Sequence, residues 1–189
     1  MVRTRSGNVY AGESYPLAKD YMLDPRNIEN VVRGMMADLS QIPNQTTGNI
    51  AGLAAVLNFL GDNILYQLHS HSNSSRYSFE QGYAHHVAPI TSNIPGEVSN
   101  QRNIQMRNHT EPKLLQEFKD RFCFEGNSNA IRWVALVTQI PVCPSCRRES
   151  VYPFSQYALA SGFDFKVYTT RNEPIRRNAR LFTEPFGEF

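Results

Sequence analysis

The chain has 189 residues, 41% of them hydrophobic, which is enough for one folded domain or one domain with an extension and argues against wholesale disorder. Its net charge of +2 permits a nucleic-acid partner but does not indicate one, and its three cysteines are too few for a disulfide framework. No apolar run is long enough to span a membrane, so we expect a protein that acts in a reducing aqueous compartment without a membrane partner.

The N-terminal region predicts a lead-in followed by one helix. Residues 1–24 are rich in Gly and Tyr and have no clear period. Over 25–42 the apolar residues recur at helical spacing, with Asp24 placed to cap the helix and Pro25 at an early position. These apolar residues are Ile28, Val31, Val32, Met35, Met36 and Leu39.

A second helix is predicted from near Thr47 to Leu68. Its apolar residues occupy more than one helical face, so we expect it to be largely buried. They are Ile50, Leu53, Ala54, Leu57, Leu60, Ile64, Leu65 and Leu68. A polar loop is expected over 69–75, and it would contain His69 and His71.

The middle of the chain predicts a β-hairpin over 76–91 and an exposed, asparagine-containing loop over 92–108. The hairpin would turn near Gln81-Gly82. Adjacent residues of a strand point to opposite faces, so His85 and His86 are not expected to act together as metal ligands.

The next elements are a helix and a central strand. Pro112 suits the first turn of a helix whose buried stripe is Leu114, Leu115, Phe118 and Phe122. Cys123 is expected to pack beside this stripe as a small apolar residue. After a turn at 125–129, the apolar run 130–140 predicts a strand covered on both faces, with Trp133 in the core.

The C-terminal part predicts a helix after Cys143 that is bent or restarted at Pro153 and ends at Ser161-Gly162. Residues 163–169 alternate as a strand, and Leu181-Phe182 is placed to add an edge strand. The arginines of the tail are equally compatible with binding phosphates and with a solvated face. They are Arg171, Arg176, Arg177 and Arg180. Periodicity alone therefore predicts an α/β domain.

Four residues form a pattern typical of a metal site with a nearby proton-transfer group. His109 and Glu111 stand two positions apart, and Cys143-Pro144-Ser145-Cys146 follows. One imidazole and two thiolates suit Zn²⁺, and three protein ligands leave the fourth tetrahedral position for water. We therefore predict zinc held by His109, Cys143 and Cys146, with Glu111 free to move protons as the catalytic residue.

This pattern resembles the H-x-E…P-C-x-x-C signature of the zinc-dependent cytidine deaminase superfamily. The string His109-Thr110-Glu111-Pro112-Lys113-Leu114-Leu115 is most similar to the deaminase domains of bacterial polymorphic toxins and effectors, and the resemblance covers roughly residues 76–171. It implies a mixed sheet flanked by helices in the order α-β-β-α-β-α-β. The predicted helix at 49–69 would be the first of that series. We expect a lead-in and helical extension over 1–45 and a catalytic domain over 46–189.

The resemblance also implies hydrolytic deamination of cytosine to uracil in a polynucleotide, with DNA slightly favoured over RNA. Glu111 would take a proton from the water that attacks C4 and pass protons to N3 and to the departing ammonia. The backbone N–H of Thr110 and a carbonyl near Pro141-Val142 would hold the base edge. Here Val142 separates Pro141 from Cys143, whereas the family usually has proline directly before this cysteine.

Residues around the base are less determined. Relatives in this superfamily often place a sugar-contacting asparagine upstream of the histidine, so the resemblance implies this role for one of Asn93, Asn100 and Asn103. The aromatic side chains of 152–157 either line a base pocket or pack in the core; they are Tyr152, Phe154 and Tyr157.

The toxin resemblance implies secretion or injection by the producing cell, action in the cytoplasm of the target cell, and an immunity protein as partner. Two alternatives stay open. One is deamination of a free nucleoside or nucleobase. The other is a non-catalytic, zinc-stabilised interaction module with partner-binding helices over 25–70, whose structural zinc would need a fourth ligand such as Cys123, His85 or His86.

Overall fold

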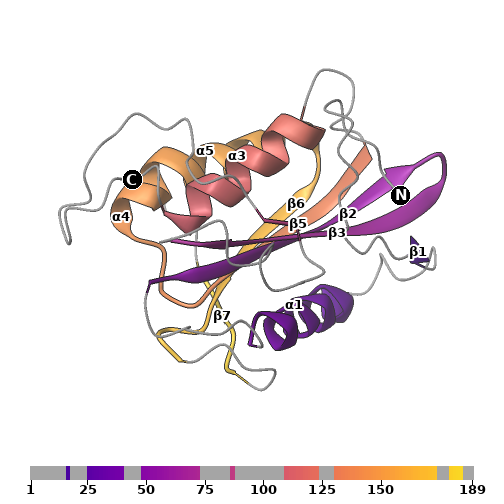
Figure 1. Cartoon of the computed structure of the whole chain (residues 1–189). Coiled ribbons are helices and arrows are strands. Elements are labelled where there is room, and N and C mark those ends of the chain that lie inside the picture. The colour runs from indigo at the N-terminus through magenta and orange to yellow at the C-terminus, as the bar shows by residue number, and fades with distance from the viewer. Residues whose placement is uncertain are drawn as a thin grey trace.

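The strands of the chain form a mixed β-sheet with helices on both faces (Figure 1). A computed structural model describes residues 25–40, 48–72, 109–123, 130–173 and 179–184, and the backbone of 16–17 and 86–87. The long strands are β2 (Ile50–Phe59), β3 (Asp62–His71), β5 (Ile131–Thr138) and β6 (Asp164–Thr169). The short strands β1 (Pro16–Leu17) and β4 (His86–Val87) pair with β3, and β7 (Phe182–Thr183) pairs with β6.

The strand order is β1-β3-β2-β5-β6-β7, with β4 also beside β3. Strand β2 is antiparallel to both β3 and β5, whereas β5 and β6 run parallel. A parallel pair needs a crossover connection, and the helical segment between β5 and β6 supplies it. The predicted α/β fold, a mixed sheet flanked by helices, is confirmed.

The helices bury two separate clusters of apolar side chains, one on each face of the sheet. Helix α1 (Pro25–Leu39) covers one face, and the other face is covered by α3 (Thr110–Phe122) and α5 (Tyr152–Ser161), as Figure 1 shows. Along β2, Ile50, Ala54 and Val56 join the α1 cluster, whereas Ala51, Leu53, Ala55 and Leu57 join the α3 cluster. The site described below lies at one end of this second face.

The helix predicted from near Thr47 to Leu68 is wrong, because residues 50–71 form the β2–β3 hairpin. Its two turn residues, Leu60 and Gly61, have φ of 54° and 93°, as tight two-residue hairpin loops require. His69 and His71, expected in a polar loop, are buried in β3. Apart from the short strands β1, β4 and β7, the order of the described elements is α-β-β-α-β-α-β, and α1 and this hairpin supply its first three members.

Helix α1 and the sheet share one apolar cluster, so α1 occupies the place on the sheet that was expected for the helix at 49–69. The described residues do not test the division of the chain at residue 45, which stays a prediction.

The elements predicted after residue 109 are confirmed, and the α-helix after Cys143 restarts at Tyr152, with Pro153 in its first turn. Strands β5, β6 and β7 and helix α3 form where expected, and Trp133 lies in the core. The short helix α4 (Pro144–Cys146) runs through a π-helical turn, η4 (Arg147–Val151), into α5. The Tyr152 N–H bonds the Arg147 carbonyl there, so the helix widens just before Pro153, which has no N–H to donate. Gly162, at φ 75°, ends α5 as predicted.

Several expectations fall outside the described residues. They are the lead-in over 1–24, the hairpin over 76–91 apart from β4, the loop over 92–108 with its three asparagines, the turn at 125–129, and Arg176 and Arg177. None of the helices in the described ranges has the length and apolar character needed to cross a membrane.

Candidate metal centre

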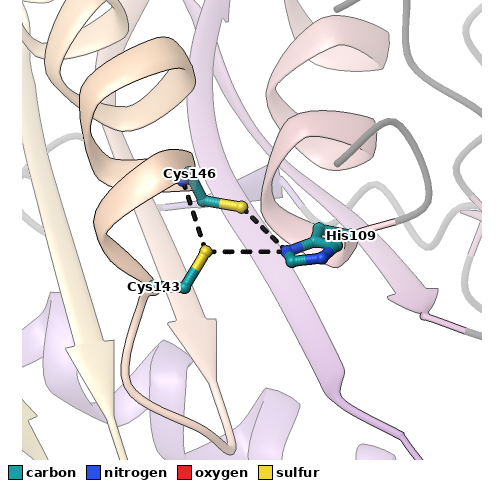
Figure 2. Close-up of side chains that lie close together, drawn as sticks. All are labelled: His109, Cys143 and Cys146. Atoms are coloured by element: carbon teal, nitrogen blue, oxygen red, sulfur yellow. Dashed lines mark hydrogen bonds between the residues drawn. The ribbon is translucent and has the colours of Figure 1, made fainter. Parts of the chain in front are cut away.

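The three predicted metal ligands meet at the beginnings of two helices. His109 directly precedes α3, and Cys143 directly precedes α4. Pro144 occupies the first turn of α4, and the Cys143 sulfur accepts a hydrogen bond from the Cys146 backbone N–H at 3.3 Å. Figure 2 shows both sulfur atoms and the imidazole pointing toward one another. Helix N-termini favour thiolates, so the local structure suits metal-binding cysteines.

The three ligand atoms lie close enough together to hold one metal ion. The His109 Nδ1 lies 3.1 Å from the Cys146 sulfur and 3.6 Å from the Cys143 sulfur, and all three ligand atoms lie within 4.8 Å of one another. Zinc bonds of about 2.0 to 2.3 Å at tetrahedral angles place an imidazole nitrogen and a thiolate sulfur about 3.6 Å apart. The group can therefore hold a metal ion, and its donor atoms suit zinc.

The candidate metal site consists of His109, Cys143 and Cys146. Among the described residues it is the only cluster of three or more His, Cys, Asp or Glu side chains with this spacing. Glu111 and Cys123 are not members, although Cys123 is half-buried beside the α3 cluster as expected. The side chains of His85 and His86, the other residues considered as a fourth ligand, lie outside the described part of the chain.

Hydrogen bonds among His109, Cys143 and Cys146 shift the pKa values of all three side chains. The pKa of Cys143 falls to about 4, chiefly because the Cys146 thiol donates to its sulfur, with His109 also contributing. The same hydrogen bond, together with burial, raises the pKa of Cys146, and the bond to Cys143 raises the pKa of His109. A bound dication would deprotonate both thiols, so metal binding here releases protons.

Glu111 lies beside the cluster without belonging to it. It is the second residue of α3, only 3% exposed, and its Oε1 accepts a hydrogen bond from the Asn49 side-chain amide at 3.0 Å. Burial raises the pKa of this carboxyl above its ordinary value. A buried carboxyl whose pKa is raised in this way can hold a proton and pass it on.

Asn49 is a site residue that the sequence did not indicate. Its Nδ2 also lies 2.8 Å from the Thr110 hydroxyl and 2.9 Å from the Thr138 hydroxyl, and its Oδ1 accepts the Ile140 N–H at 3.2 Å. Because β2 and β5 pair with Ala51 opposite Thr138, the beginning of β2 lies beside the end of β5. The predicted helix included Asn49, so this proximity was not expected. The order Gly48-Asn49 before an apolar run was the local signal that a strand could begin here.

Lys113 connects α3 to the end of β3 through a hydrogen bond. This residue is 1% exposed, and its ammonium donates a hydrogen bond to the His71 carbonyl at 2.9 Å. Burial lowers the pKa of Lys113 to about 8, while the nearby Glu111 carboxylate acts in the opposite direction. No local pattern in the sequence indicated this contact, because His71 was expected in a polar loop.

The structure locates the predicted base-contacting residues, although their roles stay predictions. Thr110 is buried at the beginning of α3, and Pro141 is exposed. The Val142 side chain is buried in the α3 cluster. Its N–H donates to the Glu184 carboxylate at 3.0 Å.

The aromatic residues that follow the cysteines differ in their surroundings. Phe154 is buried and packs against Phe118, Phe163 and Phe165, so it belongs to the core. Tyr152 and Tyr157 are half-buried. The Tyr157 ring contacts Phe163 and lies under the Lys119 ammonium.

Glu184 links the C-terminal strand segment to both ends of the cysteine motif. It bonds the backbone just before Cys143 and accepts the Arg147 guanidinium, just after Cys146, at 2.7 Å. We expect Glu184→Ala to lower the free energy of unfolding by about 2 to 3 kcal/mol, because it leaves a buried N–H without its acceptor and a guanidinium without its partner. We also expect zinc affinity to fall about tenfold or more, as for other groups that orient metal ligands.

Urea unfolding and competition with a zinc chelator measure these two effects. Glu173→Ala is the matched control, because Glu173 lies in the same C-terminal region and its carboxylate accepts the Arg180 N–H away from the cysteines. Unchanged zinc affinity in Glu184→Ala would contradict the prediction.

Comparisons of this chain with protein-family models, with curated proteins and with solved structures found no match.

Proposed function

We propose that this chain is a zinc-dependent deaminase that converts cytosine to uracil in a polynucleotide, with DNA slightly favoured over RNA. One observation carries the proposal: a three-ligand His/Cys/Cys cluster lies beside a buried carboxylate that is not part of it. A structural zinc site has no use for such a carboxylate. The resemblance of the motif to the deaminase superfamily supports the same reaction.

The proposed division of labour follows from the residues present. His109, Cys143 and Cys146 would hold the zinc ion, which when bound lowers the pKa of water and so makes it nucleophilic near neutral pH. Glu111 accepts a proton from the water that attacks C4 and delivers it to N3. It then moves the proton of the new C4 hydroxyl to the exocyclic amine. The C4–N bond breaks, ammonia leaves and the C4 carbonyl of uracil forms.

The biological context is part of this proposal and rests on the sequence resemblance to toxin and effector deaminases. We propose that the producing cell secretes or injects the protein, that it acts in the cytoplasm of the target cell, and that an immunity protein blocks its site.

The test is conversion of cytosine to uracil by the purified protein, read by mass spectrometry of the digested products. Single-stranded DNA, duplex DNA, RNA and free cytidine are offered in parallel, with Glu111→Ala as the control. We expect uracil in one of the polymers and none with the variant. Conversion of cytidine alone would replace the polynucleotide with a small-molecule substrate. No conversion of any substrate by zinc-loaded protein would contradict cytosine deamination.

A further inference from the structure

We propose that Asn49 is the positioning residue that holds the Glu111 carboxylate for proton transfer and ties it to the loop leading to Cys143. The inference rests on the proposed function, because it assigns Asn49 a task in the same reaction. It starts from three segments that meet at one side chain: the beginning of β2, the first turn of α3 and the end of β5.

The hydrogen-bonding capacity of the Asn49 amide is fully used. Its Nδ2 has two hydrogens and three acceptors in range: Thr110 Oγ1 at 2.8 Å, Thr138 Oγ1 at 2.9 Å and Glu111 Oε1 at 3.0 Å. Its Oδ1 accepts the Ile140 N–H. The side chain is therefore held at both ends, and rotating it away from Glu111 would break several bonds at once.

Thr138 completes this arrangement from the last position of β5. Its hydroxyl is closest, as a donor, to the Ile140 carbonyl at 2.8 Å, and the same oxygen accepts from Asn49. Its distance to Glu111 Oε1 is longer, 3.3 Å. Of these two donors, the Asn49 amide makes the shorter hydrogen bond to the Glu111 carboxylate. Thr138 mainly orients that amide.

A proton-transferring glutamate needs such a partner because its side chain has several rotatable bonds. A displacement of about 1 Å at a catalytic group can cost about 10²-fold in rate. The Asn49 amide restricts the carboxylate from one side, while its Oδ1 fixes residue 140, three residues before Cys143. The proton-transferring group and the ligand loop are thus placed relative to each other through one side chain.

Asn49→Asp separates the two halves of this role. An aspartate keeps an oxygen to accept the Ile140 N–H but has no amide hydrogen for Glu111. We expect kcat for cytosine conversion to fall about 10²-fold, with KM and zinc content unchanged. The matched control is Asn58→Asp at the other end of β2, where Asn58 donates to the Asn63 side chain at 2.9 Å, and its kcat should stay within about twofold of wild type. A kcat equally well retained in Asn49→Asp, or loss of zinc from it, would overturn the positioning role.

A pair of substitutions tests the contact whether or not the chain deaminates cytosine. Asn49→Asp alone sets two carboxylates against each other and should lower Tm. Adding Glu111→Gln supplies an amide donor in the opposite direction, so the double variant should regain at least half of that loss in Tm. Additive changes in Tm would overturn the inferred contact. If wild-type protein converts no cytosine but Tm recovers, the proposed function fails, the contact holds and the positioning role in cytosine deamination is overturned.

Discussion

Glu111→Gln is expected to lower the turnover number for cytosine conversion by about 10³- to 10⁴-fold while zinc stays bound. Glutamine matches glutamate in size and can still accept the Asn49 amide hydrogen, so the buried network around it is preserved. It cannot take a proton from water or return one to the base. The loss of rate therefore isolates proton transfer from positioning and from metal binding.

Rates under substrate saturation and zinc content by atomic emission measure the two quantities on the same protein sample. Glu117→Gln is the matched control, since Glu117 lies on the same helix, pairs with Arg121 and is not in the site. It should keep full activity. Turnover of Glu111→Gln within tenfold of wild type would remove the proton-transfer role, and loss of zinc would mean that Glu111 supports the metal instead.

The proximity of the three candidate metal ligands could be predicted from the sequence because the signal is local. His109 and Glu111 are separated by one residue, and Cys143 and Cys146 by two, and each pair is held by the first turn of one helix. The strand before Cys143 is an unbroken apolar run, so its central place in the sheet was also evident. The metal was predicted from the donor atoms, because few side chains bind zinc.

The hairpin β2–β3 could not be predicted from periodicity because β2 is buried on both faces. Even-numbered residues of β2 pack toward α1 and odd-numbered ones toward α3, so nearly every position is apolar and the alternation typical of strands disappears. Gly61 was the available signal, because a positive φ there allows a two-residue turn. Without that turn, the apolar residues matched helical spacing equally well.

The residues that support the site were missed for a different reason. Asn49, Lys113 and Glu184 make contacts across separations of 62, 42 and 42 positions, respectively. Such contacts depend on which strands are neighbours, and no local pattern encodes that.

Val142, which separates Pro141 from Cys143 and departs from the pattern that the sequence resembles, has a structural role. Its side chain fills the core and its N–H bonds Glu184. This residue therefore anchors the ligand loop in the interior.

Cys146→Ala is expected to abolish zinc binding and activity together. Cys146 is fully buried, and its sulfur lies 3.1 Å from His109 Nδ1, closer than the Cys143 sulfur at 3.6 Å, so the substitution removes one of the three candidate ligands from the interior of the cluster. A metal that binds only the folded chain stabilises it, so the variant should also unfold at a lower temperature than zinc-loaded wild type. A strong chelator should lower the Tm of wild type and leave that of the variant unchanged.

This difference in response to chelation separates loss of the metal from the cavity that truncating a buried side chain creates. The cavity lowers Tm with or without chelator, whereas the metal contribution is present only in protein that binds it. Cys123→Ala is the matched control, because Cys123 is a free thiol outside the cluster; its Tm should respond to chelator as wild type does. If Cys146→Ala kept about one zinc per chain, the three-ligand site would be wrong, and with it the open coordination position on which the proposed reaction depends.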